Sequence, residues 1–221
     1  MISNRLKTIA SFVPNNTNVA DIGSDHGYLL MQLFDGGHTG FLLGVENKKG
    51  PFEALKFNVN KNKYKNKINI SCSDGLNDVT NDYSTIVIAG MGADNIIEIV
   101  NQNINKLAFI NHFIIDSHTK TIEIRHFFVN LGYKIDEEVI LLEDNVFYEI
   151  IRFSKGNELY SELDYKYGPL LRKNKTPVFI NYYRQQIEKI SDILLNIDSD
   201  SKRKNELLNN LIEINEMLKD S

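Results

Sequence analysis

Three carboxylates in this chain each stand at the end of a short apolar run, where side chains could hold a nucleoside-bearing ligand. Asp21 lies in the run that begins at Val19, Glu46 ends the second run, and Asp74 ends the third and is followed by Gly75. A strand-end carboxylate such as Glu46 can accept hydrogen bonds from two ribose hydroxyls. Asp74 could accept from an adenine amino group, with room for the ring at Gly75. We therefore expect a cofactor site built from strand ends.

The turn after the first run, Asp21-Ile-Gly-Ser-Asp-His-Gly-Tyr-Leu29, indicates the charge of that ligand. Gly23 and Gly27 let the backbone approach a bound molecule closely. Asp25 stands where a dinucleotide fingerprint has its second glycine, and a carboxylate there repels a pyrophosphate but tolerates a cation. S-adenosylmethionine carries a sulfonium cation, so the pattern favours a methyltransferase.

The elements that must position these residues alternate between strand-like and helix-like segments, which is typical of an α/β fold. We predict a Rossmann-like domain with a seven-stranded, mostly parallel sheet, whose ligands bind beyond the carboxyl ends of the strands. After the first strand, at Val19, the expected strands are 41–46, 68–75, 83–92, 112–116, 133–142 and 146–153, the last two forming a hairpin. Asp94 is expected to cap a helix that ends at Asn101.

The C-terminal part has a different pattern. From Pro177 onward apolar residues recur at alternating spacings of three and four, up to Ile197. Ser199-Asp-Ser201 interrupts this rhythm, and Leu207 restarts it. The pattern predicts a helical hairpin with coiled-coil packing. We expect two domains, a cofactor-binding domain at 1–157 and a helical coiled-coil domain at 158–221.

Composition limits the partners and the chemistry. The formal net charge of the 221 residues is −4 and the pI is about 5.8, so any contact with RNA must be local. Basic residues gather at 61–67, 172–175 and 202–204. Cys72 is the only cysteine, which excludes an internal disulfide, and we expect it to be a buried thiol. The histidines lack metal-ligand spacing, so we expect no metal. We also expect no membrane span and, because the N-terminus lacks an export signal, a cytoplasmic location.

Beyond single motifs, the sequence resembles the TrmK family, bacterial tRNA (adenine-N1)-methyltransferases that modify adenine 22. The resemblance spans nearly the whole chain. The segments that carry it are Arg5-Leu6, Asp21 to Leu29, Gly50-Pro-Phe52, Ser73-Asp-Gly-Leu76, Ile88-Ala-Gly-Met-Gly92, Leu142-Glu-Asp144, Tyr148-Glu149 and Tyr167-Gly-Pro169. Three positions depart from the family pattern: Leu30 replaces a proline, Ala93 a glycine, and Ile115-Asp-Ser-His118 a Leu-Gln-Pro-Asn segment.

The resemblance implies a class I methyltransferase domain with a C-terminal coiled coil, S-adenosylmethionine as cofactor and tRNA as partner. The residues expected to bind the cofactor are Asp21, Gly23, His26, Gly27, Glu46, Asn47, Asp74, Gly75 and Gly90. Those expected to bind the substrate are Arg5, Tyr28, Gly92, Arg172 and Lys173. Asp25 and Met91 are the expected catalytic residues, with Asp25 facing the positive charge that develops on adenine when its N1 attacks the methyl group.

Two other interpretations remain open at this point. The chain could methylate a small molecule or a protein, using the same cofactor site. It could instead be a non-catalytic nucleotide-binding or coiled-coil interaction protein, in which case Glu46 and Asp74 would tolerate alanine. A monomer is expected, with a dimer through the C-terminal helices as the alternative.

Overall fold

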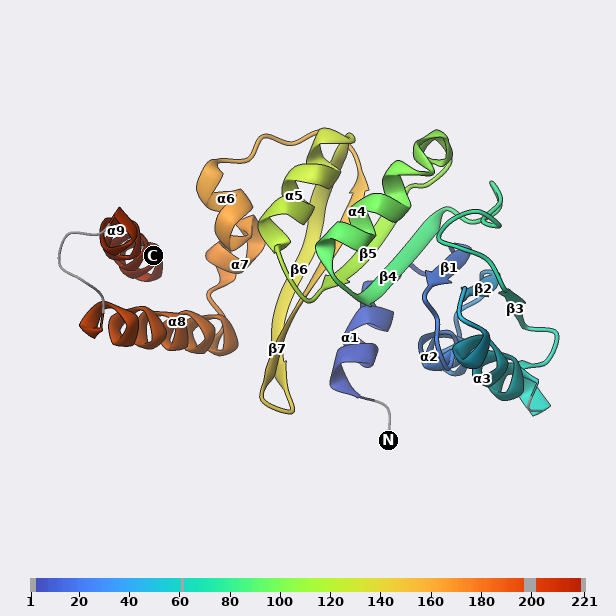
Figure 1. Ribbon diagram of the computed structural model, residues 1–221. Coiled ribbons are helices and arrows are strands. Elements are labelled where there is room, and N and C mark those ends of the chain that lie inside the picture. Colours follow the sequence, from blue (N-terminus) through green and yellow to red (C-terminus); the bar gives the residue numbers. More distant parts are fainter. Residues whose placement is uncertain (1–2, 61, 197–201, 220–221) are drawn as a thin grey trace.

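A seven-stranded sheet forms the centre of the computed structural model, which describes residues 3–60, 62–196 and 202–219 (Figure 1). Its strand order is β3-β2-β1-β4-β5-β7-β6. The strands are β1 (Val19–Ile22), β2 (Leu42–Val45), β3 (Ile68–Ser71), β4 (Thr85–Met91), β5 (His112–Ser117), β6 (Tyr133–Glu143) and β7 (Val146–Lys155). The first five pair in parallel, and β7 runs antiparallel to both β5 and β6. The predicted mostly parallel sheet is confirmed.

Helices cover both faces of this sheet. On one face lie α1 (Asn4–Phe12), α2 (Tyr28–Asp35) and α3 (Lys49–Val59), and on the other α4 (Ala93–Asn101) and α5 (Thr121–Asn130). Short 3-10 helices, η1 (Asn62–Tyr64) and η2 (Ile104–Ala108), precede β3 and β5. Alternate residues of one strand serve opposite layers: Val87 packs with α1 to α3, and its neighbours Ile86 and Ile88 pack with α4 and α5. Because both faces are covered, the central strands are apolar almost throughout.

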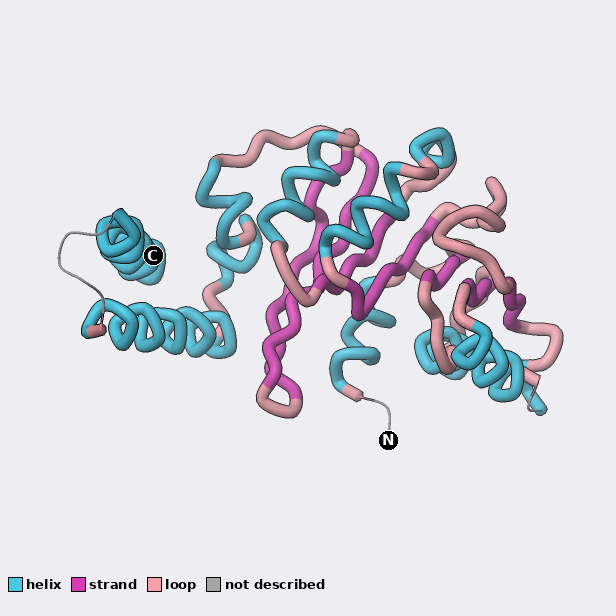
Figure 2. The backbone as a smooth tube through the Cα atoms, viewed as in Figure 1, coloured by secondary structure: helices cyan, strands magenta, loops and turns pink. Residues whose placement is uncertain are grey.

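The β6–β7 hairpin closes one edge of the sheet, as the sequence predicted. Asp144 and Asn145 form its turn, and both have a positive φ, 50° and 61°. Two successive positive φ values are typical of the type I′ turn, and Asp and Asn adopt them more readily than most residues. In Figure 2 this hairpin extends beyond the rest of the sheet.

In the part of the chain that the structure describes, the sheet is followed by α6 (Glu162–Tyr167), α7 (Pro169–Asn174), α8 (Pro177–Leu195) and α9 (Lys202–Lys219). The last two pack through Ile190, Ile214 and Met217, so the predicted helical hairpin is present. In Figure 1 α8 lies across the view and α9 is seen nearly end-on, so the two helices cross steeply and do not run side by side along their lengths. The connection at 197–201, which includes the predicted apolar position Ile197, lies outside the described residues.

The helices α6 and α7 are joined to the sheet through the guanidinium of Arg125, which is completely buried. It donates to Glu138 Oε1 (2.7 Å) and to the carbonyl oxygen of Tyr165 (3.1 Å), and it also contacts the carboxylate of Glu149. Glu138 Oε2 in turn accepts from the backbone N–H of Leu170 (2.9 Å). Removing one partner would leave buried charges uncompensated.

Two local expectations were wrong. Gly92, not Asp94, is the N-cap of α4; Asp94 lies in the first helical turn, where its carboxylate pairs with Lys120. Cys72 is exposed, because it follows the last residue of β3, where the chain has left the covered part of the sheet.

Candidate functional site

A cleft of about 620 Å³ lies at the carboxyl ends of β1, β2 and β4. This is the edge of an open α/β sheet at which ligands bind. The predicted site residues that line the cleft are Gly23, Asp25, Glu46, Asn47, Asp74, Gly75, Gly90, Met91 and Gly92. Those that do not line it are Arg5, Asp21, His26, Gly27, Tyr28, Arg172 and Lys173.

The two glycines of the turn after β1 have different roles. Gly23 has a φ of 73°, and a Cβ there would lie 2.3 Å from Met91 Cε, so glycine leaves room for Met91 at the wall of the cleft. Gly27 has a φ of 72° and is the N-cap of α2. A Cβ at Gly27 would lie 2.6 Å from Leu55 Cδ1, so this glycine is required for the packing of α3 against the turn.

Asp21 lies beneath the same turn and is almost fully buried. Its Oδ2 accepts a hydrogen bond from Ser24 Oγ (2.7 Å). Burial raises the pKa of Asp21 to about 6, against the opposing effect of the Ser24 hydrogen bond, and the nearby Glu46 raises it further. A buried carboxylate under a ligand-binding turn favours a cationic ligand above it, because a cation stabilises its ionised form.

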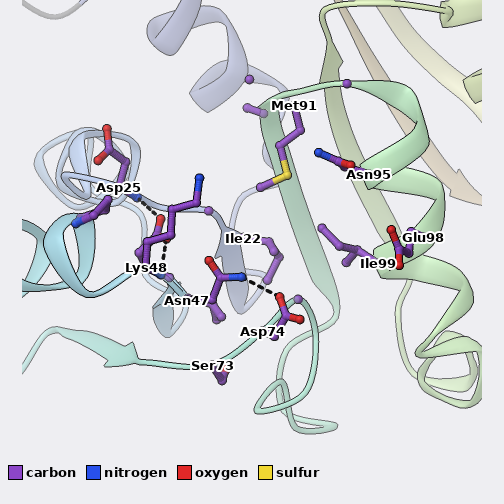
Figure 3. A pocket seen from close by; sticks show the side chains of 18 of the residues that line it. Ile22, Asp25, Asn47, Lys48, Ser73, Asp74, Met91, Asn95, Glu98 and Ile99 are labelled. Carbon is purple, nitrogen blue, oxygen red and sulfur yellow. Dashed lines mark hydrogen bonds between the residues drawn. The ribbon is translucent and has the colours of Figure 1, made fainter.

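Glu46 and its neighbours define the part of the cleft at β2 and β3. Glu46 is buried; its Oε2 accepts from the backbone N–H of Asp25 (3.3 Å) and its Oε1 from that of Lys48 (2.9 Å). Asn47 Nδ2 donates to Asp74 Oδ1 (2.8 Å), a bond drawn as a dashed line in Figure 3. These contacts fix the orientation of both carboxylates, and each oxygen can accept a further hydrogen bond from a ligand.

Asp25 lines the cleft, whereas His26 and Tyr28, which follow it in the same turn, do not. Asp25 has a φ of 49°, and its side chain is 60% exposed. In Figure 3 it lies at the left of the view, well apart from Met91 near the centre. His26 Nε2 is 3.7 Å from Asp25 Oδ1, and the His26 ring stacks on Tyr28 with the ring centroids 5.4 Å apart. This exposed aromatic pair borders the turn from outside the cleft.

Arg5 lies directly behind Gly90. A Cβ on Gly90, whose φ is 78°, would be 3.0 Å from Arg5 Nη2. Arg5 Nε donates to Asp116 Oδ2 (2.6 Å), and the guanidinium carbon is 4.8 Å from the centre of the Tyr148 ring. Asp116 is fully buried, which raises its pKa although Arg5 opposes the rise. The segment that departs from the family pattern, 115–118, thus provides the carboxylate that holds Arg5, a pairing across 111 residues that local patterns do not reveal.

Sequence reasoning missed the wall of the cleft that α4 forms. Figure 3 shows Asn95, Glu98 and Ile99 on this helix facing the cleft, and Gln102 follows at its end. Their spacing of three, one and three residues places them on one face of a helix. A helical repeat of three to four residues, counted from Gly92, would have predicted that these residues face the cleft.

Arg172 and Lys173 lie on α7, away from the cleft. They border a second, smaller cavity together with Lys175. The structure therefore does not bring the basic residues at 172–175 to the strand ends.

The cleft has the features that S-adenosylmethionine requires. Glu46 and Asp74 provide oriented acceptors at the cleft, and Asp21, beneath the turn that borders it, provides a buried carboxylate. Within 3–60, 62–196 and 202–219, no group of three or more His, Cys, Asp or Glu side chains is arranged to hold a metal ion. Nor does any helix in those ranges combine the length and apolarity needed to span a membrane.

Comparison with known proteins gives a consistent result. A family model described as tRNA (adenine(22)-N(1))-methyltransferase matches residues 19–217. A Bacillus subtilis protein described as tRNA (adenine(22)-N(1))-methyltransferase is 30% identical over 99% of this chain and 96% of its own length. A crystal structure of a Streptococcus pneumoniae protein described as a putative tRNA (m1A22) methyltransferase superposes with a TM-score of 0.94, at 32% identity, over 99% of this chain and all of the other. Its complex with S-adenosyl-L-methionine gives a TM-score of 0.91 at the same identity and coverage.

Proposed function

Because this chain belongs to the tRNA (adenine(22)-N(1))-methyltransferase family, we propose that it transfers the methyl group of S-adenosylmethionine to N1 of adenine 22 in tRNA. The observation that carries the proposal, beside the family membership, is the cleft at the carboxyl ends of β1, β2 and β4, which Glu46 and Asp74 line and beside which Asp21 is buried. We assign Asp21 to the charge of the methionine portion, Glu46 to the ribose hydroxyls and Asp74 to the adenine amino group.

The reaction needs no general base at the attacking atom. N1 of neutral adenine has a free lone pair, and S-adenosylmethionine supplies an activated methyl group when bound. The main task of the protein is to hold N1 about 3 to 3.5 Å from the methyl carbon, in line with the bond that breaks. We propose that N1 and the methyl carbon align beside the wall of the cleft that Gly23 and Met91 form. The Met91 side chain packs directly against Gly23 there.

Its second task is to stabilise the positive charge that methylation places on the base. Asp25 is the proposed group, because its carboxylate lies at the cleft, is more than half exposed and has no ion pair other than the 3.7 Å approach of His26 among the described residues. A carboxylate that faces the developing positive charge lowers the barrier by stabilising that charge in the transition state. We propose that His26, which is 3.7 Å from Asp25, contacts the cofactor. Gly27 does not touch the cofactor itself but allows the turn that places Asp25 at the cleft.

The tRNA would approach from the side of β5. The cofactor residues occupy the ends of β3, β2, β1 and β4, so the open neighbour in the strand order is β5. Arg5 lies there, held by Asp116 and Tyr148 behind Gly90. We propose that Arg5 and Gly92 contact the target nucleotide, Tyr28 the base, and Arg172 and Lys173 more distant parts of the tRNA.

The decisive experiment uses the purified full-length protein, labelled S-adenosylmethionine and an unmodified bacterial tRNA transcript. A matched transcript carries guanine in place of adenine 22, and arrest of reverse transcription maps the methyl group. Transfer to the first transcript that is lost with the second supports the proposal. Transfer at another nucleotide would keep the enzyme class and discard the site.

The same assay distinguishes the two alternatives. A methyltransferase of small molecules or proteins would bind S-adenosylmethionine but leave both transcripts unlabelled. A non-catalytic interaction protein would bind the cofactor weakly, and Glu46→Ala would not change that binding.

We further propose that the protein acts as a cytoplasmic monomer divided into domains at 1–157 and 158–221. Light scattering on the eluted peak of a gel-filtration column tests the first point, since a dimer would double the mass of 25.4 kDa. Limited proteolysis tests the second, because a domain boundary predicts early cleavage near residues 156–160.

A further inference from the structure

A second cavity, of about 240 Å³, lies in the C-terminal helices, remote from the strand ends. It is lined by Asp164, Pro169, Arg172, Lys173, Lys175 and Met217, which come from α6, α7 and the turn after it, and α9. Three of these six side chains are cationic and one is acidic. The cavity is therefore positively charged although the whole chain carries a net negative charge.

The Lys175 ammonium is the unexplained group in this cavity. Its Nζ is buried, and no atom of the described residues accepts a hydrogen bond from it. A buried ammonium normally has a partner, because removing it from water without one is costly. Lys175 is the C-cap of α7, where its φ of 40° and ψ of 54° are a left-handed conformation that lysine seldom adopts. The described residues thus hold a cation at the cavity and provide no anion that accepts from it.

The one acidic side chain of the cavity does not fill that role. Asp164 Oδ1 accepts from Arg172 Nη1 (2.5 Å), and Asp164 Oδ2 accepts from both the backbone N–H and the hydroxyl of Ser161 (2.9 and 2.7 Å). The pKa of Asp164 is held below its usual range by these contacts despite partial burial. Asp164 therefore neutralises Arg172, and the charges of Lys173 and Lys175 remain uncompensated among the described residues.

We propose that this cavity binds one phosphate group of the RNA backbone, with Lys175 as its central donor and Arg172 and Lys173 at its rim. The inference rests on the proposed function, because it takes the ligand to be the tRNA whose adenine enters the cleft. A phosphodiester fits, since lysine binds phosphate as a point charge and the site offers several N–H donors around a small volume. In Figure 1 the turn between α7 and α8 and the carboxyl end of β4 lie at a similar height, on either side of the β6–β7 hairpin, and we take one tRNA to reach both sites.

The test is the salt dependence of tRNA affinity for the full-length variant Lys175→Gln. Loss of one phosphate contact should weaken binding about tenfold and flatten the slope of log Kd against log salt by about one. Lys189→Gln is the matched control, because Lys189 is an exposed lysine of α8 outside the cavity and the charge change is the same. Lys175→Arg, which keeps the charge, should retain most of the wild-type slope.

A second measurement separates ligand binding from a structural role. Because no described residue accepts a hydrogen bond from Lys175 Nζ, Lys175→Gln should not lower the melting temperature without RNA, whereas loss of a structural contact would lower it. An unchanged slope, or equal losses in Lys175→Gln and Lys189→Gln, would overturn the proposal. If inorganic phosphate binds the wild-type protein but not Lys175→Gln, while tRNA affinity in phosphate equals that in a chloride control of the same ionic strength, the cavity takes a free anion and the proposal is wrong.

The two proposals fail in different ways. Methylation of adenine 22 by the wild-type protein, measured on the same preparations, tests the cleft alone. If methylation occurs but Lys175→Gln binds tRNA with the wild-type salt slope, only the phosphate site is wrong. If the wild-type protein binds tRNA without methylating it and Lys175→Gln flattens the slope, the phosphate site stands and the assigned reaction falls.

Discussion

Replacing the buried carboxylate of Asp21 by a neutral amide should make the free protein more stable and its cofactor complex weaker. Asp21→Asn keeps the shape of the side chain and an oxygen that can accept from Ser24. It removes a charge that the folded protein holds almost completely out of water. The variant therefore separates the energetic cost of this carboxylate from its proposed role under the cofactor.

The size of the effect follows from the pKa. Burial raises the pKa of Asp21 from 3.8 to about 6, so between these pH values the folded protein retains a proton that the unfolded chain has released. Stability therefore falls as pH rises from about 4 to about 6. Above that window the cost is complete, about 3 kcal/mol at about 1.36 kcal/mol per pKa unit. At pH 7.5 Asp21→Asn should recover up to about 3 kcal/mol, or about 6 to 12 °C in melting temperature for a chain of this size.

Thermal unfolding of the free protein from pH 4 to pH 8 measures this gain in stability. Calorimetric titration with S-adenosylmethionine measures the affinity for the cofactor. The pH dependence between about 4 and 6 should flatten in the variant, and affinity for S-adenosylmethionine should fall about tenfold, as expected when a charge-assisted contact is lost. Asp25→Asn is the matched control for stability, because it makes the same change in the same turn at a side chain that is 60% exposed. A melting temperature of Asp21→Asn equal to that of wild type at pH 7.5, with the same slope below pH 6, would refute the reasoning.

Three further predictions concern the cleft and the junction with the C-terminal helices. Glu46→Gln should weaken S-adenosylmethionine binding at least tenfold by calorimetry, because its amide N–H would face a backbone N–H and one acceptor for the ribose is lost. Glu98→Gln on α4 is the control, and a change below twofold in Glu46→Gln would contradict the assignment. Asp25→Asn should lower turnover at saturating cofactor about 10- to 100-fold in single-turnover assays, and full turnover would exclude the proposed charge stabilisation. Arg125→Met should cost about 3 to 5 kcal/mol by leaving two carboxylates without their cation, and a loss below about 1 kcal/mol in chemical denaturation would show that they are compensated otherwise.

The order of elements could be predicted from the sequence because each signal is local. The strands β1 and β2 are buried on both faces, whereas β3, at the edge of the sheet, is buried at Ile68 and exposed at Asn69. Short apolar runs bounded by turn residues identify such strands without knowledge of the fold. A hairpin of the runs 133–142 and 146–153 was predicted because only a short polar segment separates them, and the structure places its turn at Asp144-Asn145. Asp94 was misplaced because either Gly92 or Asp94 could precede the helix, and only the backbone path decides between them.

The cofactor half of the candidate site was also predictable to a large extent. Parallel strands end at one edge of a sheet, so the residues that follow β1, β2, β3 and β4 must meet there whatever their separation in the chain. Asp25, Glu46 and Asp74 accordingly line one cleft. Gly27 and His26 were also expected to bind the cofactor, but they lie outside the cleft because Gly27 packs against Leu55 of α3 and His26 is exposed.

By itself, the sequence determined the fold class, the strand-end carboxylates and the resemblance to a tRNA methyltransferase family, because each depends on residue types at short spacing. Only the tertiary structure decided that Arg5 is held by Asp116, that Arg125 joins two buried carboxylates to α6 and α7, and that Lys175 has no anion among the described residues. These facts depend on distances between side chains more than ten residues apart in the chain, and on burial, which sets the cost of a charge. Neither quantity exists until the sheet and its helices have packed.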